Sequence, residues 1–344
     1  MFSISEFIKV NRVYFIWAVF LSTLYLFRSM FGLVFMTFIM CFIFASIGHK
    51  IRRKYHWNRR VIVVSLYLLF LLFEILFVAV VPTKLINETI SFTEQLPKTI
   101  YFFKNWIDTQ TQGNEILSMI VDQLSMNISP DKTLMRAWSM SLSFLHVGIH
   151  YIGWFFLAML FSFLILLDLP TLSLGIRKLR DTKLAETYKE IAGSVVLFAK
   201  VVGENFRAQL IISAINTFLT AIGLYFLGIK AIALLCTIVF ICGLIPVLGM
   251  IISSVPILLM AVNTGGMVLG LWAFMMIIFI HVLEAYVLNP RIVSSVMHIN
   301  PVMTLIILYI AHSFLGLWGM LLGVPIAVYF YRKINVLPIK NVGQ

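Results

Sequence analysis

Long apolar segments separated by short polar ones run through the whole chain. A membrane-spanning helix needs about 17–25 predominantly apolar residues. By this measure we expect spans at 13–28, 31–47, 61–81, 146–167, 208–228, 231–262, 267–288 and 302–331. The first two would form a tight hairpin, and the third would stop at Pro82. The pattern predicts an all-α polytopic membrane protein of about eight transmembrane helices.

Three other stretches repeat apolar side chains every three or four positions, which is typical of amphipathic helices. Two of them, 92–107 and 117–128, lie in the long loop after the third span. They either lie on the membrane face and pack on each other, or form a gate over a pathway, and the sequence leaves both open. The third, 184–202, follows a basic segment. It would couple the two halves while resting on an anionic leaflet.

These patterns divide the chain into six regions. The expected regions are 1–82 (N-terminal membrane helices), 83–145 (extracytoplasmic amphipathic helices), 146–168 (fourth membrane helix), 169–207 (cytoplasmic amphipathic linker helices), 208–332 (C-terminal transport core) and 333–344 (cytoplasmic tail).

Composition and charge agree with a membrane protein and exclude other classes. Of 344 residues, 61% are hydrophobic and 12% charged, which is too apolar for a soluble enzyme or a disordered chain. The net charge of +12 is concentrated in 48–60, 169–207 and the tail after 331, while 82–145 is slightly acidic. Basic loops face the cytoplasm, so we expect both termini inside and no nucleic-acid partner.

The three cysteines, Cys41, Cys236 and Cys242, all lie in apolar segments. They predict neither a disulfide framework nor a metal site, and no cofactor is expected. Motifs of metalloproteases, serine hydrolases and nucleotide-binding loops are absent from the sequence, which predicts that the protein is not an enzyme.

Proline and glycine interrupt the C-terminal spans. The segment 231–262 contains Gly243, Pro246, Gly249 and Pro256, and the run 243–249 should break a helix. The segment then either crosses the bilayer or turns back within it. Broken helices in transporters often form the substrate site, although a single kinked helix with no site would also fit. Further interruptions fall between Asn289-Pro290 and Asn300-Pro301, and at Pro325.

Polar residues at membrane depth are costly, and they are functional candidates for that reason. His281 and Glu284 are three positions apart and share a helix face. Arg291 could pair with Glu284 or with Asp168. Gln209 and Asn216 form a further polar cluster. The cluster would be a proton or cation relay, the polar wall of a solute site, or a structural ion pair.

Small residues recur every four positions in the same spans, as in 213–221, 266–270 and 319–327. Such stripes let helix backbones approach closely.

Three motifs together resemble a known family. They are Phe240–Gly249 followed by Pro256, then Asn289–Ile292 followed by Asn300-Pro301, then Gly316–Pro325. Their order and spacing are similar to those of the autoinducer-2 exporter family over about 195–332, and the N-terminal half matches in layout. Met250 stands where members often have proline, and Asn300 stands where they often have histidine.

The resemblance implies a bacterial inner-membrane protein of about eight spans that assembles as a homo-oligomer such as a pentamer. It also implies export of small solutes, with the signal autoinducer-2 as namesake, while other members are proposed to exchange sodium or lithium for protons.

We therefore weigh three functions. The first is a secondary transporter that exports a small polar, autoinducer-2-like solute, driven by an ion gradient or by diffusion. The second is a monovalent cation/proton antiporter, and the third is a non-transporting membrane protein that binds partners through 85–145. For the first, the expected pathway residues are Pro246, Gly249, Pro256, His281, Glu284, Asn289, Pro290, Arg291, Gln209 and Asn216.

Overall fold

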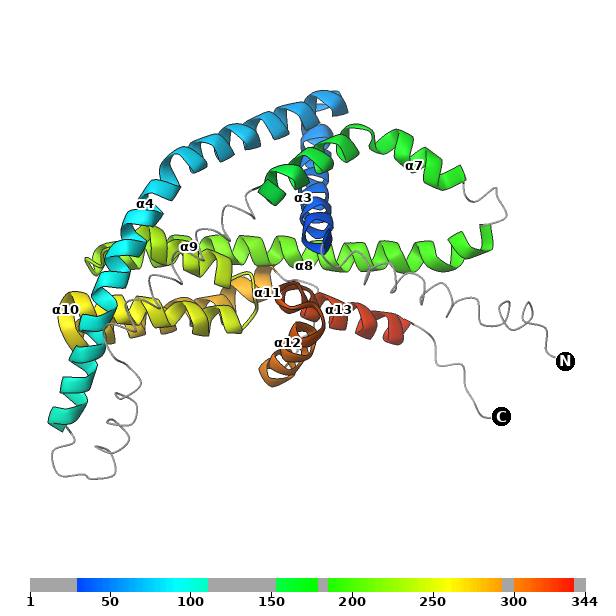
Figure 1. Ribbon diagram of the computed structural model, residues 1–344. Coiled ribbons are helices and arrows are strands. Elements are labelled where there is room, and N and C mark those ends of the chain that lie inside the picture. Colours follow the sequence, from blue (N-terminus) through cyan, green and yellow to red (C-terminus); the bar gives the residue numbers. More distant parts are fainter. Residues whose placement is uncertain (1–29, 111–152, 179–184, 293–299, 337–344) are drawn as a thin grey trace, which may run out of the picture. The chain divides into compact units, whose positions relative to one another are not determined.

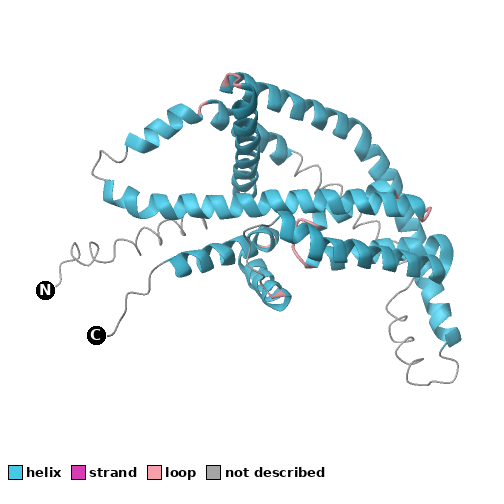
Figure 2. Cartoon of the chain, turned by 180° about the vertical axis from the view of Figure 1, so that it is seen from behind, coloured by secondary structure: helices cyan, strands magenta, loops and turns pink. Residues whose placement is uncertain are grey.

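The computed structural model describes residues 30–110, 153–178, 185–292 and 300–336, and in these ranges it is built of helices and turns without strands (Figures 1 and 2). Within these ranges, four helices are long and apolar enough to cross a membrane. A fifth span is possible where Gly153–Leu167 meets Leu169–Lys178 at a bend of 68°. Helices suit this setting because each satisfies its own backbone hydrogen bonds without water. The protein is a multi-pass membrane protein. The first expected span, 13–28, and the helix expected at 117–128 lie outside the described residues.

The described residues form two compact units. One draws on Met1–Tyr67 and His150–Ala185, and the other on Leu68–Ile149 and Glu186–Gln344.

The first unit contains α3 (Phe31–Tyr55), the first turns of α4 (Arg59–Gln110), the helix Gly153–Leu167 and α7 (Leu169–Lys178). Its core is centred on Tyr67, whose hydroxyl donates to Ser162 Oγ at 2.8 Å. Arg59 closes the unit by donating to the carbonyl of Leu166 at 2.7 Å. The Tyr67–Ser162 and Arg59–Leu166 hydrogen bonds thus join helices that are far apart in the sequence.

The second unit is built on α8 (Ala185–Phe226), beside which lie α9 (Ile232–Cys242) and α10 (Leu248–Leu283) (Figures 1 and 2). One core joins these three helices through Leu224, Leu235 and Met260. A second core joins α8 to α12 (Pro301–Leu315) and α13 (Leu317–Val336). Ile245, in the loop between α9 and α10, lies in this second core. The loop is therefore packed against residues of α8, α12 and α13.

Helix α4 was expected to stop at Pro82, and that expectation was wrong. The helix continues through Pro82 and Pro97 to Gln110. A proline removes one hydrogen bond and kinks a helix, but neighbouring turns can carry the helix onward. The amphipathic stretch 92–107 is therefore the last part of α4. In the same way, the expected linker helix 184–202 and the span 208–228 are both parts of α8.

The segment 302–331 was expected to be one span, but it is broken at Gly316. Gly316 has φ 58° and ψ −138°, a conformation that favours glycine. A Cβ at Gly319 would collide with the carbonyl oxygen of Ala311, and one at Gly323 would lie 3.0 Å from the Ala311 Cβ. These contacts show that α12 and α13 fold back on each other through the small residues of 319–327. Pro325, expected to interrupt the span, lies inside α13.

Candidate functional site

A polar stripe runs along one face of α8. Gln209, Ser213, Asn216 and Thr220 recur at intervals of four, three and four residues, which places them on one side of the helix. Ser213, Asn216 and Thr220 are buried, with exposed fractions of 0%, 8% and 4%. At 1.5 Å per residue, Gln209 and Asn216 are about 10 Å apart along the helix. The stripe therefore places polar side chains at two neighbouring places: the break between α9 and α10, and the carboxylate of Glu284.

The first of these places is the break between α9 and α10. The Gln209 side chain donates to the carbonyl of Gly243, and the Ser213 hydroxyl donates to the carbonyl of Phe240, both at 2.6 Å. These carbonyls belong to the last turn of α9, where an α-helix leaves its final carbonyl groups unpaired. The polar stripe thus supplies the hydrogen bonds that the broken helix lacks.

The backbone of the break is tightly turned. Val247 has φ 65° and ψ −56°, and the N–H of Leu248 donates to the carbonyl of Pro246 at 2.7 Å, which closes a γ-turn around Val247. A β-branched residue at positive φ is an outlier that costs about 1–3 kcal/mol. A Cβ at Gly249 would overlap the carbonyl oxygen of Cys242, so only glycine fits there. The expected break at 243–249 is present, and it stores backbone strain.

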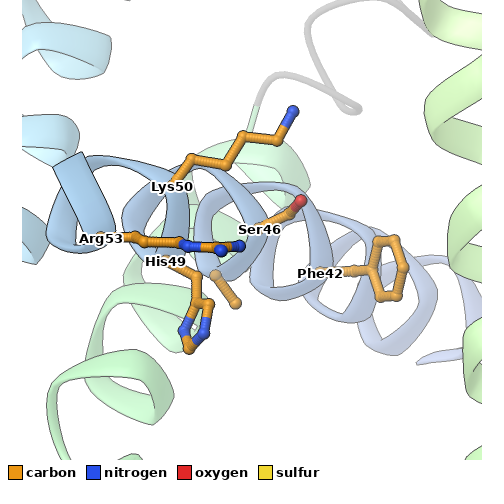
Figure 3. Close-up of a pocket in the computed structure, with 6 residues that line it drawn as sticks. Phe42, Ser46, His49, Lys50 and Arg53 are labelled. Carbon is orange, nitrogen blue, oxygen red and sulfur yellow. The ribbon is translucent and has the colours of Figure 1, made fainter.

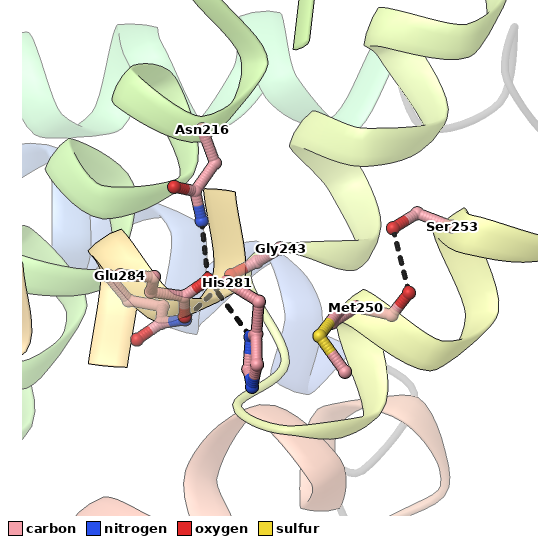
Figure 4. Close-up of polar contacts among 7 residues, drawn as sticks. Asn216, Gly243, Met250, Ser253, His281 and Glu284 are labelled. Carbon is pink, nitrogen blue, oxygen red and sulfur yellow. Dashed lines mark hydrogen bonds and ion pairs between the residues drawn. The ribbon is translucent and has the colours of Figure 1, made fainter. Parts of the chain in front are cut away.

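The second place is a carboxylate cluster. Asn216 Nδ2 donates to Glu284 Oε2 at 2.6 Å, and His281 Nδ1 lies 3.9 Å from the same oxygen (Figure 4). The side chain of Glu284 is 20% exposed and that of His281 is 40% exposed. The carboxylate is thus mostly withdrawn from solvent while the histidine reaches toward the surface of the unit. Sequence spacing predicted that His281 and Glu284 share a face, and their distance agrees with it.

Some polar atoms in this cluster have no hydrogen-bond partner in the described part of the chain. They are Asn216 Oδ1 and His281 Nδ1. A buried polar atom without a partner costs about 1–3 kcal/mol, so such atoms are candidates for binding a proton, water or ion.

Glu284 also begins an irregular stretch of helix. Residues Glu284–Leu288 form a π-helical turn, and the N–H of Asn289 donates to the carbonyl of Glu284. Pro290 follows directly. It has no N–H, and its ring would crowd the carbonyl four residues earlier, so a widened turn at this point relieves the crowding. Turns of this kind occur frequently at functional sites.

In the described part of the chain, the other expected pathway residues make no side-chain hydrogen bond or ion pair with the Asn216–Glu284–His281 cluster. Pro246 lies in the break, whereas Pro256 is inside α10, which continues through it. Asn289, Pro290 and Arg291 belong to the short helix α11 (Asn289–Ile292) and are exposed. In the ranges that the structure describes, Arg291 makes no ion pair with Glu284, because it lies two turns further on and faces outward. Asp168, its other expected partner, belongs to the first unit.

Sequence reasoning missed a set of contacts from α4. Glu88 Oε2 accepts from the N–H of Leu234 at 2.7 Å, near the start of α9. One turn later Phe92 packs on the core of α9 and α10, and Gln95 Oε1 accepts from Asn263 Nδ2 of α10. Together Glu88, Phe92 and Gln95 clasp the hairpin of α9 and α10. The spacing of four and three residues was visible in the sequence, but the partners, 146 and 168 residues away, were not.

Asn263 lies just before a second irregularity. Gly265 and Gly266 leave helical geometry, and Gly266 has φ 68°. This is the boundary at which the sequence separated the segments 231–262 and 267–288.

Among the described residues, no group of three or more His, Cys, Asp or Glu side chains is arranged to hold a metal ion.

Comparison with known proteins covers nearly the whole chain. A family model described as AI-2E family transporter matches residues 14–339. A candidate transport protein of Bacillus subtilis (strain 168), YdbI, is 29% identical over 94% of this chain and 91% of its own length. A candidate transport protein of Alkalihalophilus pseudofirmus is 24% identical over 82% of this chain and 75% of its own length. A protein of Halobacillus andaensis named sodium-lithium/proton antiporter is 22% identical over 80% of this chain and 81% of its own length.

Proposed function

Because this chain belongs to the AI-2E family of transporters, we propose that it is a secondary transporter that exports a small polar, autoinducer-2-like solute. In this proposal Glu284 binds and releases the cation whose gradient drives the export. The observation that carries the proposal is the partly buried Asn216–Glu284–His281 cluster, which lies within about 10 Å of a strained helix break along α8.

Glu284 has the surroundings that such a carrier needs. When ionised, its carboxylate accepts the hydrogen bond from Asn216 Nδ2, which stabilises the charge. When Glu284 is protonated, its carboxylate loses its negative charge, and its electrostatic attraction for the Asn216 and His281 side chains becomes weaker. The π-helical turn that starts at Glu284 gives the backbone an alternative hydrogen-bond register. A carboxylate that changes charge on a helix of this kind is suited to couple ion binding to movement.

The break between α9 and α10 is the candidate place for the solute. Its backbone turns at a depth where irregular structure is tolerated only inside protein or beside water. The glycines there keep side chains out of the turn, and Gln209 and Ser213 hold its carbonyl groups. A small polar solute would find amide and hydroxyl groups, and a break that is already strained needs less energy to rearrange.

A second function, monovalent cation/proton antiport, is favoured by a different observation. Asn216 Oδ1 is buried beside the Glu284 carboxylate and has no hydrogen-bond partner among the described residues, and such hard oxygen atoms suit sodium or lithium. The relative from Halobacillus andaensis is named for that activity. In this reading Glu284 would hold either the cation or protons in alternation.

We further propose that the protein works as a homo-oligomer in the bacterial inner membrane with both termini in the cytoplasm. The distribution of basic residues supports that orientation.

The test is a flux measurement on purified protein in liposomes that contain a pH-sensitive dye. We expect added autoinducer-2, sodium or lithium to change the lumenal pH, and Glu284→Gln to reduce that change to the level of empty liposomes. A response to autoinducer-2 alone favours the exporter, and a response to sodium or lithium alone favours the antiporter.

The matched control is Glu204→Gln. Glu204 lies on α8, its side chain is 37% exposed, and it is 4.0 Å from Lys200, so the same chemical change there should leave flux intact. Normal ion-coupled flux in Glu284→Gln would remove Glu284 from the mechanism. Absence of flux with every solute in the wild-type protein would favour the partner-binding function through 85–145 instead.

A further inference from the structure

One face of α3 carries a hollow that the transport proposal does not use. Its volume is about 470 Å³, and it is lined by Phe42, Ala45, Ser46, His49, Lys50 and Arg53 (Figure 3). These positions follow each other at intervals of three, one, three, one and three residues, so they lie on one face of the helix.

The lining changes in character along the helix. Phe42 and Ala45 are apolar, whereas His49, Lys50 and Arg53 in the last turns are cationic or able to become so. Phe42 and Lys50 are separated by about 12 Å along the axis, at 1.5 Å per residue. Helix α3 is one of the four candidate spans, so this face passes from the hydrocarbon layer into the charged boundary of the membrane. A lipid with an apolar acyl chain at one end and a negatively charged group at the other matches this change from an apolar to a basic surface.

Basic residues outnumber acidic ones at the end of α3. The stretch 48–60 contains six Lys or Arg residues and no acid. Some of these are engaged, since Arg59 donates to Leu166 and Lys54 lies over the ring of Tyr55 at 5.2 Å. Lys50 and Arg53 make no ion pair with any described residue and are exposed. Arg and Lys are the residues that bind phosphate most often, Arg through two parallel hydrogen bonds and Lys as a point charge.

We propose that the hollow on α3 binds the phosphate headgroup of an anionic phospholipid such as phosphatidylglycerol. Lys50 and Arg53 contact the phosphate, His49 and Ser46 flank it, and one acyl chain lies along Ala45 and Phe42. The site is independent of the transport mechanism, because it lies in the other compact unit and contains none of the proposed pathway residues.

Binding to the full-length protein in neutral detergent can be measured by native mass spectrometry during titration with phosphatidylglycerol. We expect saturable binding, little binding of phosphatidylcholine, and no competition from millimolar inorganic phosphate. The double variant Lys50→Gln/Arg53→Gln should bind phosphatidylglycerol about thirtyfold more weakly, as expected for two cations near an anionic headgroup.

The matched control is Arg52→Gln/Lys54→Gln, which removes the same charge from the same helix end but from residues that do not line the hollow. It should keep nearly wild-type affinity. Thermal unfolding of both double variants checks that each is folded, and Arg53→Lys, which keeps the charge, should be only weakly affected. Equal losses in the two double variants would overturn the proposal, because binding would then depend on charge alone. Displacement of the lipid by inorganic phosphate, or equal binding of phosphatidylcholine, would also overturn it.

Discussion

Helix α4 and the α9–α10 hairpin both carry prolines, yet only the hairpin is broken. In α4 the chain stays helical through Pro82 and Pro97, and this helix contains no glycine. Between α9 and α10 a single proline, Pro246, stands between two glycines, and the helix ends. The comparison shows that proline alone does not end a helix in this protein.

Two further conditions are met only at the break. Glycine allows the backbone to pass close to itself, as at Gly249 beside the carbonyl of Cys242. The polar stripe of α8 provides donors for the carbonyl groups that the ended helix exposes, through Gln209 and Ser213. At the break between α9 and α10, a residue that disfavours the helix, residues that permit the turn and a neighbour that satisfies the freed backbone thus occur together.

The largest effect is expected from removing the permissive residue. Gly249→Ala places a Cβ against the backbone of Cys242, which cannot shift cheaply, so the free energy of unfolding should fall by about 3 kcal/mol. The control Gly193→Ala makes the same change in α8 where a Cβ would meet no described atom outside its own stretch of helix within 4 Å, and it should stabilise the helix by about 1 kcal/mol. Unfolding titrations in mixed detergent micelles compare the two. Similar stabilities would show that the close approach at Gly249 is unimportant.

The next effect is a difference of sign between two prolines. Pro82→Ala restores a hydrogen bond inside α4 and should raise the free energy of unfolding by about 2 kcal/mol. Pro246→Ala should lower it by about 1 kcal/mol, because the unfolded chain gains freedom while the turn remains. The same titration measures both. If Pro246→Ala raised the free energy of unfolding as much as Pro82→Ala, Pro246 would be straining the chain at the break.

The smallest effect tests the hydrogen bond that Ser213 of α8 donates to the break. Ser213→Ala leaves the carbonyl of Phe240 without its donor in a buried place, which should cost about 1–2 kcal/mol. In the control Ser254→Ala, the lost hydroxyl is exposed and, among the described residues, bonds to Ile251 of its own helix, so a change below about 0.5 kcal/mol is expected. Equal effects would mean that α8 does not support the break.

Local patterns were sufficient for part of this description. Apolar segment lengths predicted a helical membrane protein, and the run Gly243–Gly249 predicted a break because proline and glycine act on their immediate neighbours. The spacing of His281 and Glu284 correctly predicted a shared helix face. The end expected at Pro82 failed because helix continuation depends on the flanking turns, and the single span expected over 302–331 failed because Gly316 permits a fold-back.

Contacts between distant segments were beyond the reach of such patterns. Asn216 could be identified as a polar residue at depth, but its bond to Glu284 depends on how α8 and α10 pack. Nothing near Glu88 indicates that it accepts a hydrogen bond from Leu234. The sequence left open whether Arg291 pairs with Glu284 or with Asp168, and in the structure Arg291 is exposed on α11, beyond the widened turn.

The clasp that α4 places on the hairpin also orders events during biosynthesis. Glu88 is made early, and its partner Leu234 is translated 146 residues later. At about 5–20 residues per second, the ribosome needs roughly 7–30 s to supply that partner. The hydrogen-bond acceptor for the first turn of α9 is therefore already part of the chain when α9 is synthesised. The clasp of Glu88 and Gln95 can form only after both helices of the hairpin have been made, so it is a late contact of folding.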